Sequence, residues 1–164
     1  MSERPGSSRL PDLGPRGEGW VALQFTLLIA VVGAAALGPR WRADLRAVGL
    51  MTGIVLMALG AMLALWGSRG LGAALTPLPR PRDDASFRDA GAYRLVRHPI
   101  YGGVLLLAVG AALLSSPLAL VPAACLGLLF EGKRQREEGW LTERYPEYAC
   151  YRRRVHRRFV PYVW

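Results

Sequence analysis

A basic, aromatic loop runs directly into an apolar segment in Gly91-Ala-Tyr93-Arg94-Leu-Val-Arg97-His98-Pro99-Ile-Tyr101-Gly102-Gly103. About thirty residues later, a charged segment leaves the next apolar stretch, with the sequence Lys133-Arg134-Gln-Arg-Glu137-Glu138-Gly-Trp-Leu141. If the two apolar stretches are neighbouring membrane helices, these polar clusters lie at the mouths of both helices. The pattern therefore predicts a site where a polar ligand can meet a lipid-borne one.

The apolar content of the chain predicts a membrane protein. Of the 164 residues, 52% are hydrophobic, and many lie in unbroken runs. Trp20 to Gly38 is 19 residues without a charge and Ala47 to Gly67 is 21, and each run meets the length of about 20 that a bilayer core requires. We expect membrane helices over 20–38 and 47–67, with Gly49, Gly53 and Gly60 allowing a neighbouring backbone to approach closely.

A third apolar tract predicts a helical hairpin. Ile100 to Phe130 is 31 residues long and is interrupted by Ser115-Ser116-Pro117. At 1.5 Å per residue it would be about 46 Å long, too long for one span and short for two. Since Pro117 suits the first turn of a new helix and the serines can cap it, we expect helices over 99–114 and 117–141, the second extending into the cytosol. The predicted fold is all-α, with about four transmembrane helices.

The positive charges predict the orientation. Of the 21 Lys and Arg residues, 18 fall in segments that share one side of a four-helix topology with both termini cytoplasmic. The net charge of +9 is then membrane-surface charge facing anionic headgroups, so a nucleic-acid partner is not needed to explain it. The Arg, Ala and Gly usage suggests a bacterial source, hence an inner membrane.

Three segments outside the predicted spans have distinct compositions. Residues 1–19 are rich in Gly, Pro and Ser and predict a disordered cytoplasmic tail. The loop 68–98 is long for a connection without function and predicts a lid or one wall of a site, with prolines at 77, 79 and 81 and a charged stretch over 83–89. The basic, aromatic tail 142–164 predicts a helix lying on the membrane surface.

The two polar clusters suggest complementary binding groups. Pro99 falls at the first position of a helix, and the N–H groups of that turn can seat an anion such as a carboxylate. Gly102 and Gly103 would leave room for a ligand against the backbone. Glu137 and Glu138 could hold an ammonium or a ribose diol. Each feature alone also has a structural explanation, since glycines pack membrane helices and glutamates commonly face solvent.

The motifs resemble the isoprenylcysteine carboxyl methyltransferase family, whose layout the related phospholipid N-methyltransferases share. The resemblance rests on Arg97-His98-Pro99-Ile-Tyr101, on Glu137-Glu138-Gly-Trp-Leu141, and on Tyr145-Pro-Glu-Tyr148-Ala-Cys-Tyr151, in that order across a membrane hairpin. It covers about Leu75 to Pro161, whereas the first two helices are similar only as generic membrane helices.

The resemblance implies an integral membrane enzyme that binds S-adenosylmethionine at the cytoplasmic face, with neither a Rossmann fold nor a metal. It implies a lipophilic or membrane-borne methyl acceptor, with carboxylate O-methylation most similar to the family. Headgroup N-methylation and a non-catalytic lipid-binding or scaffolding role stay open, as does the oligomeric state. The implied cofactor shell consists of Tyr93, Arg97, His98, Pro99, Tyr101, Gly102, Gly103, Glu137, Glu138 and Leu141.

The implied chemistry is an in-line displacement, which depends on holding the nucleophile and methyl group in a near-attack geometry. A carboxylate nucleophile needs no base, whereas an amine or thiol must lose a proton, for which we expect His98. We expect Arg97 or Arg94 to orient an anionic group of the substrate. Arg134 stands one turn before Glu138 and is expected to hold a glutamate.

Overall fold

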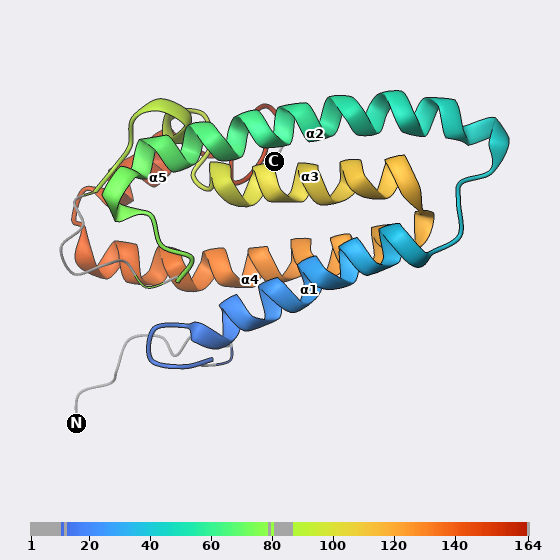
Figure 1. Ribbon diagram of the computed structural model, residues 1–164. Helices are drawn as coiled ribbons and strands as arrows, with labels where there is room; N and C mark the ends of the chain where they lie inside the picture. Colours follow the sequence, from blue (N-terminus) through green and yellow to red (C-terminus); the bar gives the residue numbers. More distant parts are fainter. Residues whose placement is uncertain (1–10, 12, 79, 81–86, 164) are drawn as a thin grey trace.

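The computed structural model of the chain describes residues 11, 13–78, 80 and 87–163, and every regular element in this part is helical (Figure 1). Four long helices form the body. The elements are, in chain order, α1 (Glu18–Leu37), α2 (Ala43–Leu71), η1 (Gly72–Ala74), η2 (Gly91–Arg94), α3 (Pro99–Ser115), η3 (Pro117–Ala119), α4 (Leu120–Arg144) and α5 (Tyr148–Arg154).

Helices α2 and α3 pack side by side and antiparallel through glycines (Figure 1). A Cβ atom on Gly53 would lie 2.8 Å from the Gly110 carbonyl oxygen, and one on Gly60 would lie 2.7 Å from that of Gly103. No larger side chain fits at such separations without moving a helix. The close packing expected at these glycines is confirmed.

Helix α1 lies along α4 on the other side of the bundle (Figure 1). Val31 of α1 packs with Ala108, Ala123, Leu126 and Phe130 in the apolar core. The start of α3 and the end of α4, which carry the predicted site, lie at the end of the bundle opposite the α1–α2 connection (Figure 1).

The hairpin turn falls where the sequence predicted it. Helix α3 ends at Ser115, and η3 begins at Pro117 and leads into α4. The Ser116 hydroxyl accepts a hydrogen bond from the Leu118 amide at 3.2 Å, and the Trp41 indole donates to the Ala112 carbonyl at 2.9 Å. A serine cap and a proline start the second helix, as expected.

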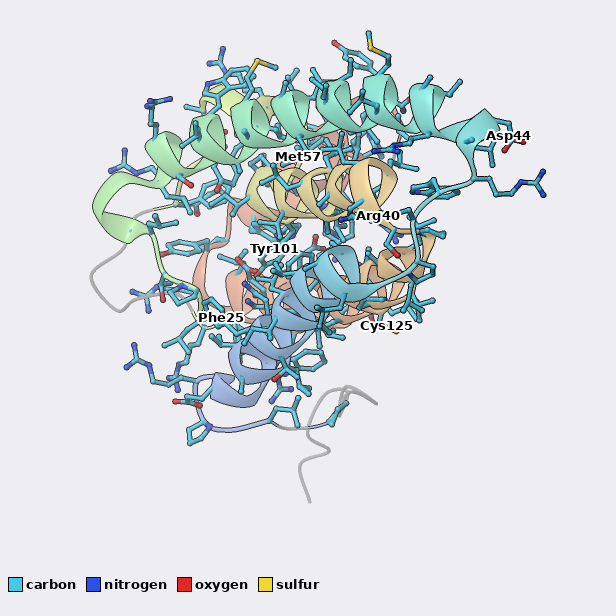
Figure 2. All side chains as sticks on the ribbon, turned by 45° about the vertical axis from the view of Figure 1, so that its right-hand side comes forward. Phe25, Arg40, Asp44, Met57, Tyr101 and Cys125 are labelled. Carbon is cyan, nitrogen blue, oxygen red and sulfur yellow. The ribbon has the colours of Figure 1, made fainter. Side chains whose placement is uncertain are left out.

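Within the described residues two helices, α1 and α2, are long and apolar enough to cross a membrane, whereas α3 is apolar but shorter. Helix α2 extends beyond the predicted span 47–67 at both ends. Many large apolar side chains of α1 and α2 are exposed, including Phe25 at 52% and Met51 at 66%. Tyr101, in contrast, lies inside the bundle (Figure 2). An apolar surface this extensive suits lipid contact.

The C-terminal tail differs from the expected surface helix. Residues 142–144 still belong to α4, the described tail beyond them is helical at Tyr148–Arg154, and Tyr148, Tyr151 and Phe159 are buried against the protein. The amides of Arg97 and His98 donate to the carbonyls of Arg157 and Arg158 at 3.0 and 2.8 Å. Part of the tail therefore packs against the protein, because buried backbone amides require acceptors and the tail supplies them, while contact of the tail with a membrane surface stays a prediction.

Two other expectations concern segments that are described only in part. Residues 1–10 and 12 of the expected N-terminal tail lie outside the described residues, as do Pro79, Pro81 and 82–86 of the charged loop. The described part of the loop does form a wall, because Ala74 to Leu78 and Phe87 to Tyr93 both contribute residues to the cavity described below.

Candidate functional site

A cavity of about 390 Å³ lies among α1, the end of α2, α3, α4, α5 and the loop. One face of α4 forms its long wall, because Phe130, Lys133, Glu137 and Leu141 line it at successive turns. At 1.5 Å per residue this wall is about 16 Å long. Six of the ten predicted cofactor residues line the cavity: Tyr93, Arg97, His98, Tyr101, Glu137 and Leu141.

Glu138 is the centre of a buried ionic network. Its carboxylate accepts from Arg97 Nε at 2.9 Å and faces His98 Nε2 at 3.0 Å and Arg134 Nη1 at 3.0 Å. Burial would raise the pKa of Glu138, but the hydrogen bonds and charges of His98 and Arg97 outweigh it and lower the pKa to about 2. With both oxygens engaged, Glu138 is not available to a ligand. The two glutamates therefore do not present two equally free carboxylates to the cavity, and the predicted contact between Arg134 and a glutamate is confirmed.

Arg97 joins this network to the C-terminal tail. Its Nη1 donates to the carbonyl of Val155 at 2.7 Å and to that of His156 at 2.9 Å. Both the start of α3 and the tail are thereby held against Glu138 of α4. These contacts make Arg97 a structural tie, and they do not support the expectation that it orients a substrate anion.

Glu137 is the glutamate that faces the cavity. Its Oε2 accepts from the Tyr101 hydroxyl at 2.6 Å and lies 3.8 Å from His98 Nδ1. The side chain is 25% exposed, and within the described part of the chain only Oε2 has a protein partner. The other oxygen is therefore free to accept a hydrogen bond from a hydroxyl or ammonium group of a ligand.

An aromatic stack fixes the position of Tyr101. The Tyr101 ring stacks on His98 at a centroid distance of 5.3 Å and on Phe130 at 4.7 Å. This stack holds the hydroxyl on Glu137 and orients both side chains. Because each His98 ring nitrogen faces a glutamate, the geometry does not favour His98 as a base for the acceptor.

Lys133 is a cavity residue that the sequence interpretation missed. Its side chain is fully buried, and its ammonium donates to Gln24 Oε1 at 2.6 Å and to the Pro77 carbonyl at 2.8 Å. Burial lowers the pKa of Lys133 to about 8, although the charge of Glu137 raises it in part. The sequence signal that could have identified Lys133 is its spacing, since Lys133 lies on the same helical face as Phe130, Glu137 and Leu141.

The end of the cavity near Leu141 is aromatic. The centroid of the Phe87 ring lies 5.9 Å from that of Tyr148 and 5.3 Å from that of Tyr151, and Phe87 is edge-on to both rings. The Tyr151 hydroxyl donates to the Tyr93 carbonyl at 2.7 Å, and Leu141 and Tyr145 pack against the same cluster. Burial raises the pKa of Tyr93 and of Tyr148, so both phenols stay protonated.

The glycines after Pro99 do not open the site as expected. A Cβ atom on Gly102 would overlap the Phe159 carbonyl, and one on Gly103 would lie 2.6 Å from the Gly60 carbonyl oxygen. Their missing side chains leave room for the protein's own backbone, so the expectation of space for a ligand was wrong at both positions. Pro99 is buried and Arg94 exposed, and neither is among the described residues that line the cavity.

A comparison with known protein families matches the part of the chain that contains α3 and α4. A family model described as phospholipid methyltransferase matches residues 48–148, more than half of the chain. The matched region includes α3, the whole of α4 and the residues around Glu138, and it confirms the resemblance seen in the sequence. No curated protein matches the chain. With an apolar helical bundle and this match, the chain belongs to the phospholipid methyltransferase family, which is a family of membrane methyltransferases.

Proposed function

We propose that the protein transfers a methyl group from S-adenosylmethionine to a lipophilic or membrane-borne acceptor. The observation that carries the proposal is the cavity along α4, which connects an aromatic end near Leu141 to an apolar end near Phe130. A carboxylate, Glu137, lies between the two ends. A site of this form can hold a polar donor and a lipophilic acceptor next to each other.

The residues fit the proposed donor. The volume of about 390 Å³ lies within the range of about 300 to 1,000 Å³ typical of small-molecule sites. Aromatic rings at the end near Leu141 suit an adenine, and the free oxygen of Glu137 suits a ribose hydroxyl or an ammonium group. When bound, S-adenosylmethionine supplies an activated methyl group for in-line attack by the acceptor.

The acceptor end combines an apolar wall with one buried cation. Ile100, Val104 and Phe130 provide the apolar surface, and the Lys133 ammonium contacts only neutral oxygens among its hydrogen-bond partners in the described residues. A buried cation without a carboxylate in contact favours an anionic partner. Lys133 would hold a carboxylate beside the methyl group, and a carboxylate needs no base. We therefore favour carboxylate O-methylation.

The family match favours a second candidate, methylation of the nitrogen of a phospholipid headgroup. An amine acceptor must lose a proton before it attacks. With a pKa of about 8, Lys133 is the group in the cavity suited to accept that proton. The headgroup phosphate would then need another cation, and Arg88 also lines the cavity.

The proposed orientation places the site at the cytoplasmic face of a bacterial inner membrane, with both termini cytoplasmic. The arginine-rich tail supports this proposal, because it packs at the same end of the bundle as the site, and positive charge concentrates on the cytoplasmic side of membrane proteins.

Incorporation of a labelled methyl group separates the candidates. The purified protein in lipid nanodiscs is incubated with methyl-labelled S-adenosylmethionine and either a lipophilic carboxylic acid or phosphatidylethanolamine. O-methylation gives an ester that releases labelled methanol in alkali, whereas N-methylation gives an alkali-stable label in the headgroup. Label in neither acceptor, from folded protein that also fails to bind S-adenosylhomocysteine, would support the lipid-binding role instead.

A further inference from the structure

One buried hydroxyl in the cavity lacks a partner. Tyr148 is 2% exposed, and its hydroxyl is the one buried side-chain polar atom without a hydrogen bond in the described part of the chain. An unsatisfied buried hydroxyl is unfavourable, so folded proteins rarely retain one without a reason. Because Tyr148 lines the cavity, a bound ligand can supply the missing partner.

The neighbouring tyrosine shows that the fold can satisfy such a group. Tyr151 lies one turn later on α5, lines the same cavity and donates to the Tyr93 carbonyl at 2.7 Å. The two tyrosines share a helix and a cluster, yet only one hydroxyl is used by the protein. This difference points to a ligand contact at Tyr148.

The surroundings of Tyr148 indicate whether its hydroxyl contacts the methyl donor or the methyl acceptor. Its ring packs edge-on to Phe87 at 5.9 Å and in a cluster with Tyr93 and Leu141, at the aromatic end. Leu141 lies eight residues beyond Lys133 on α4, about 12 Å along the helix from the proposed acceptor end. A flat, aromatic group with ring nitrogens fits a cavity of rings better than a lipid does.

The protonation of Tyr148 fits this role. Burial raises its pKa, and the nearby charges of Glu138 and Glu137 raise it further despite the opposing charge of Arg97. The phenol therefore stays neutral and can donate to a ring nitrogen or a ribose oxygen, or accept from an amino group.

We propose that the Tyr148 hydroxyl is a hydrogen-bond partner of the purine nucleoside of the bound cofactor. This inference rests on the proposed function, since it assumes that the cavity takes S-adenosylmethionine. It adds a binding residue on α5, in the C-terminal segment that otherwise packs against the start of α3.

Tyr148→Phe removes the hydroxyl and retains the ring. Titration of S-adenosylhomocysteine into the full-length protein in detergent should give an affinity about tenfold weaker than wild type, as expected for a lost hydrogen bond. The unfolding temperature without ligand should equal or exceed that of wild type, because no protein hydrogen bond is lost. Tyr151→Phe should lower it. Tyr162→Phe, at a residue 79% exposed, is the control for affinity.

The outcomes separate the inference from the proposed function. Wild-type affinity in Tyr148→Phe, with saturable binding by the wild type, would overturn the inference and leave the proposed function standing. An unchanged dissociation constant with a raised KM for the acceptor would assign Tyr148 to the acceptor and also overturn it. A destabilisation equal to that of Tyr151→Phe would show that the protein itself uses the hydroxyl. No binding by folded wild type would contradict the proposed function.

Discussion

Replacing Glu138 with Gln should destabilise the protein strongly, although Glu138 is not among the described residues that line the cavity. The carboxylate of Glu138 is 5% exposed and contacts Arg97, His98 and Arg134. A glutamine keeps the shape but not the charge, so the buried Arg97 would lose its carboxylate partner, whereas Arg134 keeps Glu131 and His98 keeps the more distant Glu137.

The magnitude follows from the pKa of Glu138, which the folded protein lowers from 4.5 to about 2. At about 1.4 kcal/mol per pH unit, this shift corresponds to about 3 kcal/mol of stability. For a chain of this size it corresponds to a fall of about 6 to 12 °C in unfolding temperature. Because the folded pKa is lowered, this stabilisation is fully present above pH 4.5 and is lost as the pH falls toward 2.

The assay is tryptophan fluorescence during heating of the detergent-purified protein between pH 3 and pH 7. Glu143→Gln is the matched control, because Glu143 is on the same helix and exposed. Glu138→Gln should lower the unfolding temperature at pH 7 and flatten its dependence on pH below 4.5, whereas the control should resemble wild type. An unfolding temperature within 2 °C of wild type at pH 7 would refute the reasoning, since about 1 kcal/mol or less would then depend on this charge.

Other changes test other parts of the structure. Folding lowers the pKa of Lys133 from 10.5 to about 8, so the stability of the wild type should rise as the pH increases from 8 to 10.5. Lys133→Met should remove this rise, and unfolding temperatures at pH 7 and pH 10 measure it. Gly102→Ala should lower the free energy of unfolding by about 1 to 3 kcal/mol through overlap with the Phe159 carbonyl, whereas Gly139→Ala, which meets no neighbour within 4 Å, should not; thermal unfolding compares the two. Arg154→Ser breaks an exposed ion pair, so unfolding temperature and S-adenosylhomocysteine affinity should both stay near wild type.

The helical layout could be read from the sequence because it depends on local signals. Uncharged runs of membrane length, the serine-proline turn at Pro117 and the glycines of α2 each act over a few residues. The shared site of Tyr101 and Glu137 also followed, because polar groups at the ends of adjacent helices must lie together. Helix α2 proved longer than predicted since its terminal turns carry Arg46 and Arg69, which a hydropathy criterion excludes.

The remaining features depend on contacts between distant segments, which periodicity does not reveal. Gly102 accommodates the Phe159 carbonyl, 57 residues away in sequence. The glutamate pair looked equivalent, yet Glu138 meets three basic groups and Glu137 faces the cavity. The sequence places Lys133 one turn before Glu137, but only the packing of Gln24 and Pro77 over its ammonium reveals that it is buried.

The central claim is that the cavity binds S-adenosylmethionine through Glu137. Calorimetric titration of S-adenosylmethionine and S-adenosylhomocysteine into wild type, Glu137→Gln and Glu143→Gln tests it most directly. We expect saturable binding to wild type and to the Glu143 control, and a loss of at least tenfold in affinity for Glu137→Gln, which retains the fold. Wild type that is folded but does not bind, or Glu137→Gln that binds like wild type, would contradict the claim.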